Sequence, residues 1–296
     1  MTTMRTLTFN GATIAYRLRR PGEPRRTIVA LHGLASNMTR WSEFAAATRL
    51  AESWDILCVD LRGHGNSLHR GRVGMEVWCA DLAALLAHER VPRAVLVGHC
   101  LGANLALWFA HRHPGLVAGL ALVEPMFRQA LTGELARAAR LRPLIAAALP
   151  VLRGLAAIGL HRRHLDALDL EQLDREARAA MAASGGAFPK ARYASVREDL
   201  RSLPLSIYLQ DMLAVTGPLP ALPGITVPTL ALLSAGTSFT DPGLTARALA
   251  ALSNCQVVRL DAQHWIPTEQ PEAMRRAIED WCRAAFGVPP GLTLPA

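Results

Sequence analysis

The sequence predicts an α/β protein with a mostly parallel sheet that is covered by helices on both faces. Short apolar runs rich in β-branched residues alternate with longer segments whose apolar residues recur at helical spacing. This alternation is typical of parallel strands joined by crossover helices. One apolar run also leads directly into a sharp turn and a helix-prone segment, at residues 94–111. Hydrophobic residues form 51% of the 296-residue chain, which is enough for a large buried core.

The first part of the chain supplies most of the predicted strands. Thr6–Phe9 and Ala12–Arg17 are predicted to form a hairpin, because Asn10-Gly11 between them favours a tight turn. The apolar runs that follow predict buried strands at 27–31, 55–59, 94–98 and 119–123. The intervening segments predict helices at 41–51, 75–89 and 101–111.

The pattern changes in the segment from Pro125 to Val227. This segment contains no convincing strand and is rich in Ala, Leu and Arg with helical periodicity, as in Leu170–Ala183. Prolines interrupt it at positions 143, 150, 189, 204, 218, 220 and 223. Because both of its ends return to the sheet, we expect an α/β core of residues 1–124 and 228–296 with an inserted helical cap of residues 125–227.

The last part of the chain returns to the alternating pattern. Pro228–Leu233 and Gln256–Leu260 are predicted strands, and helices are predicted at 244–252 and 271–286. The tail Gly287–Ala296 contains three prolines and is expected to be loose.

The charge balance argues against a nucleic-acid-binding protein. The formal net charge is +8, but arginine supplies almost all of the basic residues and no basic cluster is interleaved with aromatic residues. The basic balance is compatible with anionic substrates or an acidic carrier domain. The apolar stretch Leu141–Leu160 does not predict a membrane span, because arginines and prolines interrupt it at positions 142, 143, 150 and 153.

Cysteine usage and the N-terminus predict a cytoplasmic location. The five cysteines are irregularly spaced and include no Cys-x-x-Cys pair, which favours a reduced protein. Cys58, Cys79 and Cys282 lie in predicted strands or helices, and we expect them to be small core residues. Met1–Arg5 lacks the apolar region of a signal peptide.

The most informative motif is Gly98-His99-Cys100-Leu101-Gly102, at the junction of a predicted strand and helix. Glycines on both sides of Cys100 permit a bend at which a Cβ would clash. The turn would place Cys100 at the N-terminus of the helix, where backbone N–H groups and a partial positive charge stabilise a thiolate and a developing oxyanion. Cys100 is therefore a candidate nucleophile.

This motif resembles the nucleophile turn G-x-S-x-G of the α/β-hydrolase superfamily, with cysteine in place of serine. Three further segments occur in the order found in that superfamily. Leu31-His32-Gly33-Leu34 resembles its oxyanion-hole turn, and residues 60–67 resemble the loop after its next strand. Gln263-His264-Trp265, followed by Glu269-Gln-Pro-Glu272, resembles its catalytic-histidine loop. The resemblance covers nearly the whole chain and implies the α/β-hydrolase fold with a helical lid.

The resemblance also implies roles for individual residues. His264 would be the general base that takes the proton of Cys100 and returns it to the leaving group. The backbone N–H groups of Leu34 and Leu101 would form the oxyanion hole. Asp60 and Arg62, in the loop 60–67, are expected to hold that loop together by hydrogen bonds and are assigned no chemistry.

The acid that would orient His264 has two candidates. The superfamily usually places an aspartate after the strand that is here Pro228–Leu233, but Phe239 stands at the expected position and Asp241 lies two residues later. Some members, including haloalkane dehalogenases, place the acid one strand earlier, where this chain has Glu124. Glu124 is favoured over Asp241. A cysteine nucleophile that forms a thiolate–imidazolium pair also needs such an acid less than a serine nucleophile does, so a site without an acid is a third alternative.

Five residues near the motifs are expected to contact substrate. They are Ser36, Asn37, Trp41, His99 and Trp265. The sequence does not distinguish a substrate wall from core packing for Trp265. We find neither a metal-ligand pattern nor a dinucleotide-binding glycine motif, so no cofactor is indicated.

These observations predict an acyl-transfer hydrolase that acts through a Cys100 acyl-enzyme on an ester, lactone or thioester. Its partner would be a small hydrophobic acyl substrate, free or bound to a carrier. The alternative is a lyase or cyclase of natural-product tailoring on the same fold, with His264 as base and without a covalent intermediate. A non-catalytic ligand-binding relative is disfavoured, because Cys100, His264 and a plausible acid are all present.

Overall fold

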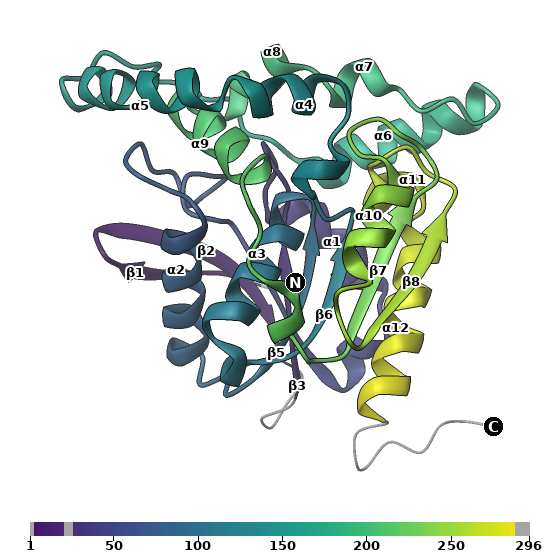
Figure 1. Cartoon of the computed structure of the whole chain (residues 1–296). Helices are drawn as coiled ribbons and strands as arrows, with labels where there is room; N and C mark the ends of the chain where they lie inside the picture. Colours follow the sequence, from purple (N-terminus) through teal and green to yellow (C-terminus); the bar gives the residue numbers. More distant parts are fainter. Residues whose placement is uncertain (1–2, 21–25, 288–296) are drawn as a thin grey trace.

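The computed structural model describes residues 3–20 and 26–287, and these residues form an eight-stranded sheet (Figure 1). The strand order is β1-β2-β4-β3-β5-β6-β7-β8. β1 pairs antiparallel with β2 and β2 antiparallel with β4, whereas all other neighbours are parallel. The strands are β1 Met4–Phe9, β2 Ala12–Arg19, β3 Arg26–Leu31, β4 Trp54–Val59, β5 Ala94–His99, β6 Val117–Val123, β7 Thr229–Ser234 and β8 Cys255–Leu260. The mostly parallel α/β fold is confirmed.

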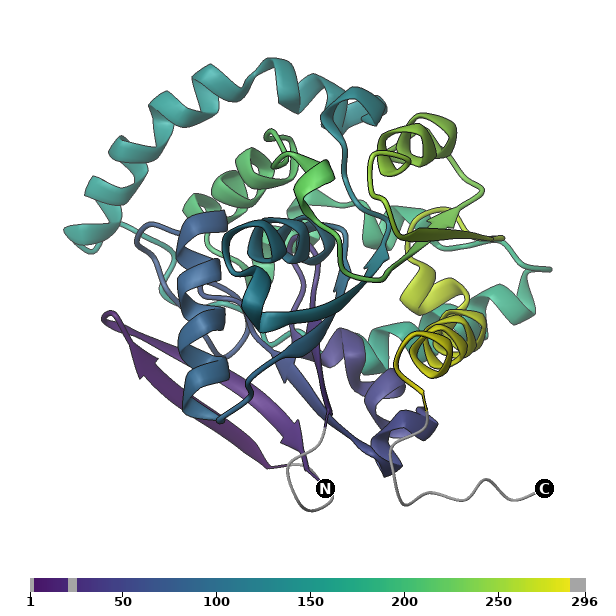
Figure 2. The ribbon, with the colours of Figure 1, turned by 60° about the horizontal axis from the view of Figure 1, so that its bottom comes forward.

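Helices pack on both faces of the sheet because side chains along each strand alternate between the faces. Val29 and Leu31 of β3 belong to the core cluster that includes α2 and α3, whereas Ile28 and Ala30 belong to the cluster that includes α1 and α12. Figure 2 shows these helices around the sheet. Their bounds are α1 Ser42–Ala47, α2 Met75–His88, α3 Leu101–Arg112, α10 Pro242–Leu249, α11 Ile266–Glu269 and α12 Pro271–Phe286.

The helix predicted at 41–51 is divided into three short pieces. The 3-10 helices η1 (Met38–Trp41) and η2 (Arg49–Glu52) flank α1. Thr48 separates α1 from η2, because its backbone is extended and its side chain accepts a hydrogen bond from the Leu50 N–H. Such local side-chain bonds compete with a continuous helix.

Residues 125–227, which we call the cap segment, contain helices and no extended strand. These are η4 Arg128–Ala130, α4 Gly133–Arg140, α5 Arg142–Ala157, α6 Leu170–Ala183, α7 Lys190–Tyr193, α8 Val196–Ser202, α9 Leu205–Val215 and η5 Leu222–Gly224. A further 3-10 helix, η3 Pro114–Leu116, precedes β6. Figure 1 shows α4 to α9 across one end of the sheet, whereas η5 packs beside α3 on the way to β7. None of the described helices is long and apolar enough to cross a membrane.

The loop between β4 and α2 is held together as expected. The Asp60 carboxylate accepts hydrogen bonds from the backbone N–H groups of Met38 and Asn66, and Arg62 forms a buried ion pair with Asp81.

Cys58, Cys79 and Cys282 are buried, and burial raises the pKa of each thiol to about 12. The tail predicted to be loose lies, from residue 288 on, outside the described residues.

Candidate active site

Cys100 occupies a strained turn between β5 and α3. Its backbone has φ +52° and ψ −110°, although φ above zero is unfavourable for a residue with a Cβ. A Cβ on Gly98 would overlap the Gly102 backbone, and a Cβ on Gly102 would overlap the Leu31 carbonyl. The Cys100 N–H donates to the Val123 carbonyl at 2.9 Å. Glycines on both sides therefore let the turn close tightly, and β6 holds it in place.

Glu124 follows the end of β6 and contacts His264 directly. The distance from Glu124 Oε2 to His264 Nδ1 is 3.1 Å, and Glu124 Oε1 accepts a hydrogen bond from the Ser234 N–H at 2.5 Å. The Glu124 N–H donates to the Leu232 carbonyl at 2.9 Å, and its backbone has φ +53°. Both carboxylate oxygens are thus engaged, one by the end of β7 and one by the imidazole.

His264 lies between Glu124 and Cys100 and is almost completely buried. Burial by itself would lower the pKa of His264, but hydrogen bonds and charge interactions with Cys100 and Glu124 raise it to about 9. With Nδ1 facing the carboxylate, Nε2 is the nitrogen left for the sulfur. The arrangement allows the imidazole to accept a proton from Cys100 and to be stabilised as a cation.

Glu269 holds the loop that carries His264, a contact that the sequence did not predict. Its carboxylate accepts hydrogen bonds from three consecutive backbone N–H groups, those of Gln263, His264 and Trp265, at 2.8, 3.1 and 2.8 Å. The signal in the sequence was a glutamate one turn after the histidine. This carboxylate fixes the backbone from which the imidazole projects.

Asp241, the other candidate acid, caps helix α10. Its carboxylate accepts a hydrogen bond from the Leu244 N–H at 2.8 Å, as expected of an N-cap aspartate. Phe239 packs edge-on against the His264 ring, with 4.8 Å between ring centroids. The structure therefore brings Glu124, and not Asp241, to the imidazole.

The two oxyanion-hole candidates lie at backbone turns beside Cys100. Leu101 is the first residue of α3, where N–H groups have no acceptor within the helix. Leu34 lines the same cavity as Cys100. His32 stabilises the turn before Leu34, since Nδ1 donates to the Gly33 carbonyl and Nε2 accepts from the Leu61 N–H. Burial and the neighbouring His64 hold the pKa of His32 well below its ordinary value, which keeps this ring neutral.

A cavity of about 370 Å³ lies over Cys100 and His264. The cap segment supplies much of its apolar lining, including Leu135, Leu168, Leu170, Leu173, Tyr208, Met212 and Val215. Ser36, His99 and Trp265, which are predicted to contact substrate, line this cavity. The cap segment also supplies charged groups to the lining, including Glu134, Asp166, Arg192, Glu198, Asp199 and Arg201. Apolar and charged groups therefore both face the space above Cys100, a mixture that suits a small-molecule pocket.

Two predicted contact residues lie outside this cavity. Trp41 is completely buried in the core cluster that includes α1 and α12, so its expected contact with substrate is corrected to core packing. Asn37 caps η1 by accepting a hydrogen bond from the Thr39 N–H, and its amide donates to the Leu168 carbonyl at 2.7 Å. Asn37 therefore ties the core to the cap segment.

Trp265 joins the histidine loop to the cap segment. Its ring stacks on Phe188 with 5.0 Å between centroids and meets Tyr193 edge-on at 5.7 Å. His99, the second predicted neighbour, contacts the His264 carbonyl through Nε2 at 3.3 Å. Burial and the adjacent His264 hold the pKa of His99 well below its ordinary value. A neutral His99 can donate to that carbonyl.

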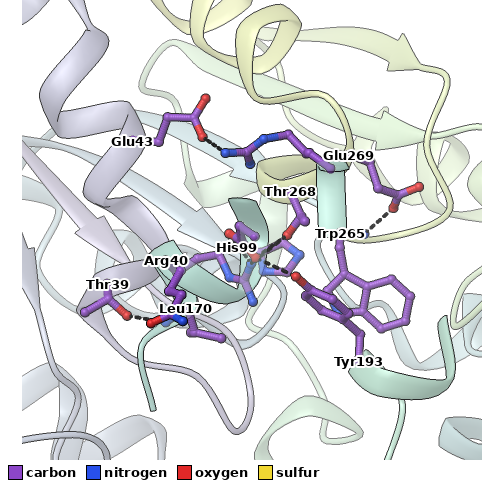
Figure 3. Close-up of polar contacts among 12 residues, drawn as sticks. Thr39, Arg40, Glu43, His99, Leu170, Tyr193, Trp265, Thr268 and Glu269 are labelled. Atoms are coloured by element: carbon purple, nitrogen blue, oxygen red, sulfur yellow. Dashed lines mark hydrogen bonds and ion pairs between the residues drawn. The ribbon is translucent and has the colours of Figure 1, made fainter. Parts of the chain in front are cut away.

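A buried polar cluster fixes the cap segment to the core (Figure 3). Arg40 Nη1 contacts Asp174 Oδ2 and Thr268 Oγ1, both at 2.6 Å, and the Tyr193 hydroxyl donates to Asp174 Oδ1 at 2.8 Å. We call Arg40, Asp174, Tyr193 and Thr268 the latch. Sequence reasoning missed it, because Arg40 and Asp174 are 134 positions apart and belong to no motif.

No group of three or more His, Cys, Asp or Glu side chains within the described ranges is arranged to hold a metal ion. The site as built consists of a thiol, an imidazole, a carboxylate and backbone N–H groups. These are the groups needed for nucleophilic attack on a carbonyl.

Known proteins resemble this chain in fold and in part of the sequence. A segment of 97 residues is 35% identical to the sn-1-specific diacylglycerol lipase of Mus musculus, covering 33% of this chain and 32% of that protein. The matches to curated relatives span about a third of the relatives' length. These segmental matches do not establish the activity of the whole chain.

Two solved structures match over almost the full length. An esterase from Thermogutta terrifontis superimposes with a TM-score of 0.69, covering 96% of this chain and 99% of that one at 22% identity. The enol-lactonase from Burkholderia xenovorans gives a TM-score of 0.67, covering 94% and 99% at 20% identity. At these identities the likeness shows the fold alone. The family model described as the alpha/beta hydrolase fold matches residues 26–271, and this chain therefore belongs to the α/β-hydrolase family.

Proposed function

We propose that the protein hydrolyses carboxylic esters, lactones or thioesters through an acyl-enzyme on Cys100. His264 is the general base in this proposal, and Glu124 orients its imidazole. The observation that carries the proposal is the 3.1 Å contact between Glu124 and a buried His264 whose imidazole lines the same cavity as Cys100. The curated relative named as a lipase and the solved structures named as an esterase and a lactonase are in keeping with acyl chemistry.

The first half-reaction transfers the acyl group to sulfur. His264 takes the thiol proton, and the thiolate attacks the carbonyl carbon to form a C–S bond while the carbonyl electrons move onto oxygen. The N–H groups of Leu34 and Leu101 would stabilise that oxyanion. The oxyanion electrons then re-form the carbonyl as the bond to the leaving group breaks, which is C–O in an ester or lactone and C–S in a thioester. The imidazolium gives its proton to the departing alkoxide or thiolate.

The second half-reaction releases the acid. His264 takes a proton from water, and the resulting hydroxide attacks the thioester carbon. The C–S bond breaks, the sulfur regains a proton from the imidazolium, and the carboxylic acid leaves. In both halves Glu124 supports the cationic imidazole, which is the role of the acid in a triad.

The lining of the cavity supports a hydrophobic acyl group as substrate. Leucines from α4 and α6 and Met212 from α9 face the space above Cys100. Apolar walls of this kind bind alkyl or aryl groups by removing their surface from water. We therefore expect longer acyl chains to react with a higher kcat/KM than acetyl esters.

The test is the intact mass of the protein after brief incubation with p-nitrophenyl esters, acyl thioesters and lactones. The protein is compared with Cys100→Ala, His264→Ala and the matched control Cys255→Ala, which removes a partly exposed free cysteine on β8. An acyl adduct that is absent from Cys100→Ala and present in Cys255→Ala supports the proposal. Absence of both adduct and turnover with every donor contradicts it and favours the lyase or cyclase alternative, in which His264 acts without a covalent intermediate.

A further inference from the structure

Helix α5 of the cap segment exposes a continuous apolar stripe. Leu141, Leu144, Val151, Leu155 and Ile158 are between 38% and 72% exposed, and we call these five residues the α5 stripe. They recur at intervals of three or four residues, with Ala148 filling the one gap, so they share one face of the helix. A contiguous row of exposed large apolar residues is unusual for a surface helix and points to an interaction.

The opposite side of α5 is already packed. Leu149 is buried, and Arg142 donates hydrogen bonds to the Leu213 carbonyl and to Thr216 Oγ1 at the end of α9. Figure 1 shows α5 in the outer layer of the cap segment, on the side away from the sheet. The stripe therefore faces outward while the helix is anchored by its other face.

Along the chain, the charges next to the stripe have a single sign. Residues 135–165 contain no aspartate or glutamate, but they contain arginines at positions 137, 140, 142, 153, 162 and 163. Arg140, directly before the stripe in the chain, and Arg163, five residues after its last member, are both exposed. An apolar face bordered by arginines is the composition of a helix that lies in the plane of an anionic membrane surface.

This charge disfavours a second copy of the chain as the occupant. Arginines stand at both ends of the stripe, so parallel and antiparallel pairing of two α5 helices would both bring like charges together. With 16 residues, α5 is too short to cross a bilayer and is suited to lying at its surface.

We propose that α5 docks the protein on the surface of an anionic lipid bilayer, with the α5 stripe inserted among the acyl chains and the flanking arginines at the phosphates. The docked face also includes part of the rim of the cavity. Val196 lines the cavity and is 46% exposed, and it lies in α8, which shares the outer layer with α5 (Figure 1). The exposed acid of α8, Glu198, forms an ion pair with Arg201 of the same helix. Docking would thus bring the mouth of the cavity close to the lipid from which a hydrophobic ester could enter.

The experiment is co-sedimentation of the full chain with vesicles. One set contains phosphatidylglycerol and phosphatidylcholine in equal amounts, and the other contains phosphatidylcholine alone. We expect binding to the anionic vesicles that weakens as salt is added. The double variant Leu144→Gln/Ile158→Gln should lower the partition coefficient by about a hundredfold or more, because each buried side chain of this size contributes at least about tenfold.

The matched control is Leu68→Gln/Val257→Gln. It removes two exposed apolar side chains that lie outside the cap segment, and it should leave vesicle binding unchanged. Thermal unfolding verifies that each variant is folded. If the stripe variant does not fold, Arg140→Glu/Arg163→Glu tests the same surface by charge and should also release the protein from anionic vesicles.

Three results would overturn the proposal. The first is absence of binding to anionic vesicles, and the second is equal binding to both vesicle types. The third is a dimer in solution that the Leu144→Gln/Ile158→Gln variant dissociates, with no vesicle binding, because it would assign the stripe to a second copy. Hydrolysis of a soluble ester is measured separately, so failure of the docking proposal and of the proposed activity are distinguishable.

Discussion

The carboxylate of Glu124 and the imidazole of His264 meet at 3.1 Å although the residues are 140 positions apart in the sequence. The pair is buried, with a relative exposure of 4% for the His264 side chain and 3% for that of Glu124. Glu124 leaves the end of β6, whereas the more usual origin of such an acid is the following strand. Phe239 fills the space beside the imidazole on that side.

Glu124→Gln should lower kcat for ester hydrolysis on the order of a hundredfold with little change in KM, because an amide stabilises the imidazolium less well. Asp241→Asn is the matched control, since its carboxylate caps α10. It should leave kcat within about twofold and stability within about 0.5 kcal/mol, because asparagine caps a helix about as well as aspartate. Equal losses of kcat in the two variants would contradict the assignment of Glu124 as the orienting acid.

The raised pKa of His264 predicts that stability depends on pH. Because the folded-state pKa of about 9 exceeds the ordinary value of 6.5, the stabilisation is fully present below pH 6.5 and is lost as the pH rises through about 9. A pKa raised from 6.5 to about 9 corresponds to roughly 3 kcal/mol at most. Urea unfolding of the protein and of His264→Gln between pH 6 and 10 measures this difference. Parallel pH profiles for the two proteins would contradict the prediction.

The buried ion pair of the latch predicts that removing one charge costs more stability than removing both. Asp174→Leu leaves the buried Arg40 without its counter-ion and should lower stability by about 3–5 kcal/mol. Arg40→Met combined with Asp174→Leu removes both charges and should recover most of that loss. Thermal unfolding measures the stability, and limited proteolysis of the cap segment measures its detachment. A double variant that is less stable than Asp174→Leu would contradict a role of charge pairing.

Gly98, two residues before Cys100, is required by the tight backbone turn and not by the reaction. Gly98→Ala places a Cβ against the Gly102 backbone and should lower stability by more than about 2 kcal/mol. Gly115→Ala is the control, because nothing lies within 4 Å of the added Cβ, and its stability should stay within about 0.5 kcal/mol. Chemical denaturation measures the free energy of unfolding of both variants. Similar losses of stability would contradict the prediction that the contact between residue 98 and the Gly102 backbone requires glycine.

The sequence alone determined the α/β class and the positions of the strands. Apolar runs such as those of β3, β5 and β6 are buried on both faces, so their composition reveals them without knowledge of their neighbours. The turn at Cys100 was equally visible, because the flanking glycines are a local consequence of a local backbone requirement. These features depend on residues that are adjacent in the chain.

Only the tertiary structure decided between Glu124 and Asp241. Both follow a strand of the same parallel sheet, and the choice depends on which loop turns toward His264 and which begins a helix. The same holds for Trp41, whose apolar ring suits a core or a cavity wall equally well until its neighbours are placed. The latch between Arg40 and Asp174 joins residues that no local pattern connects, because its stability arises from burial of both charges together.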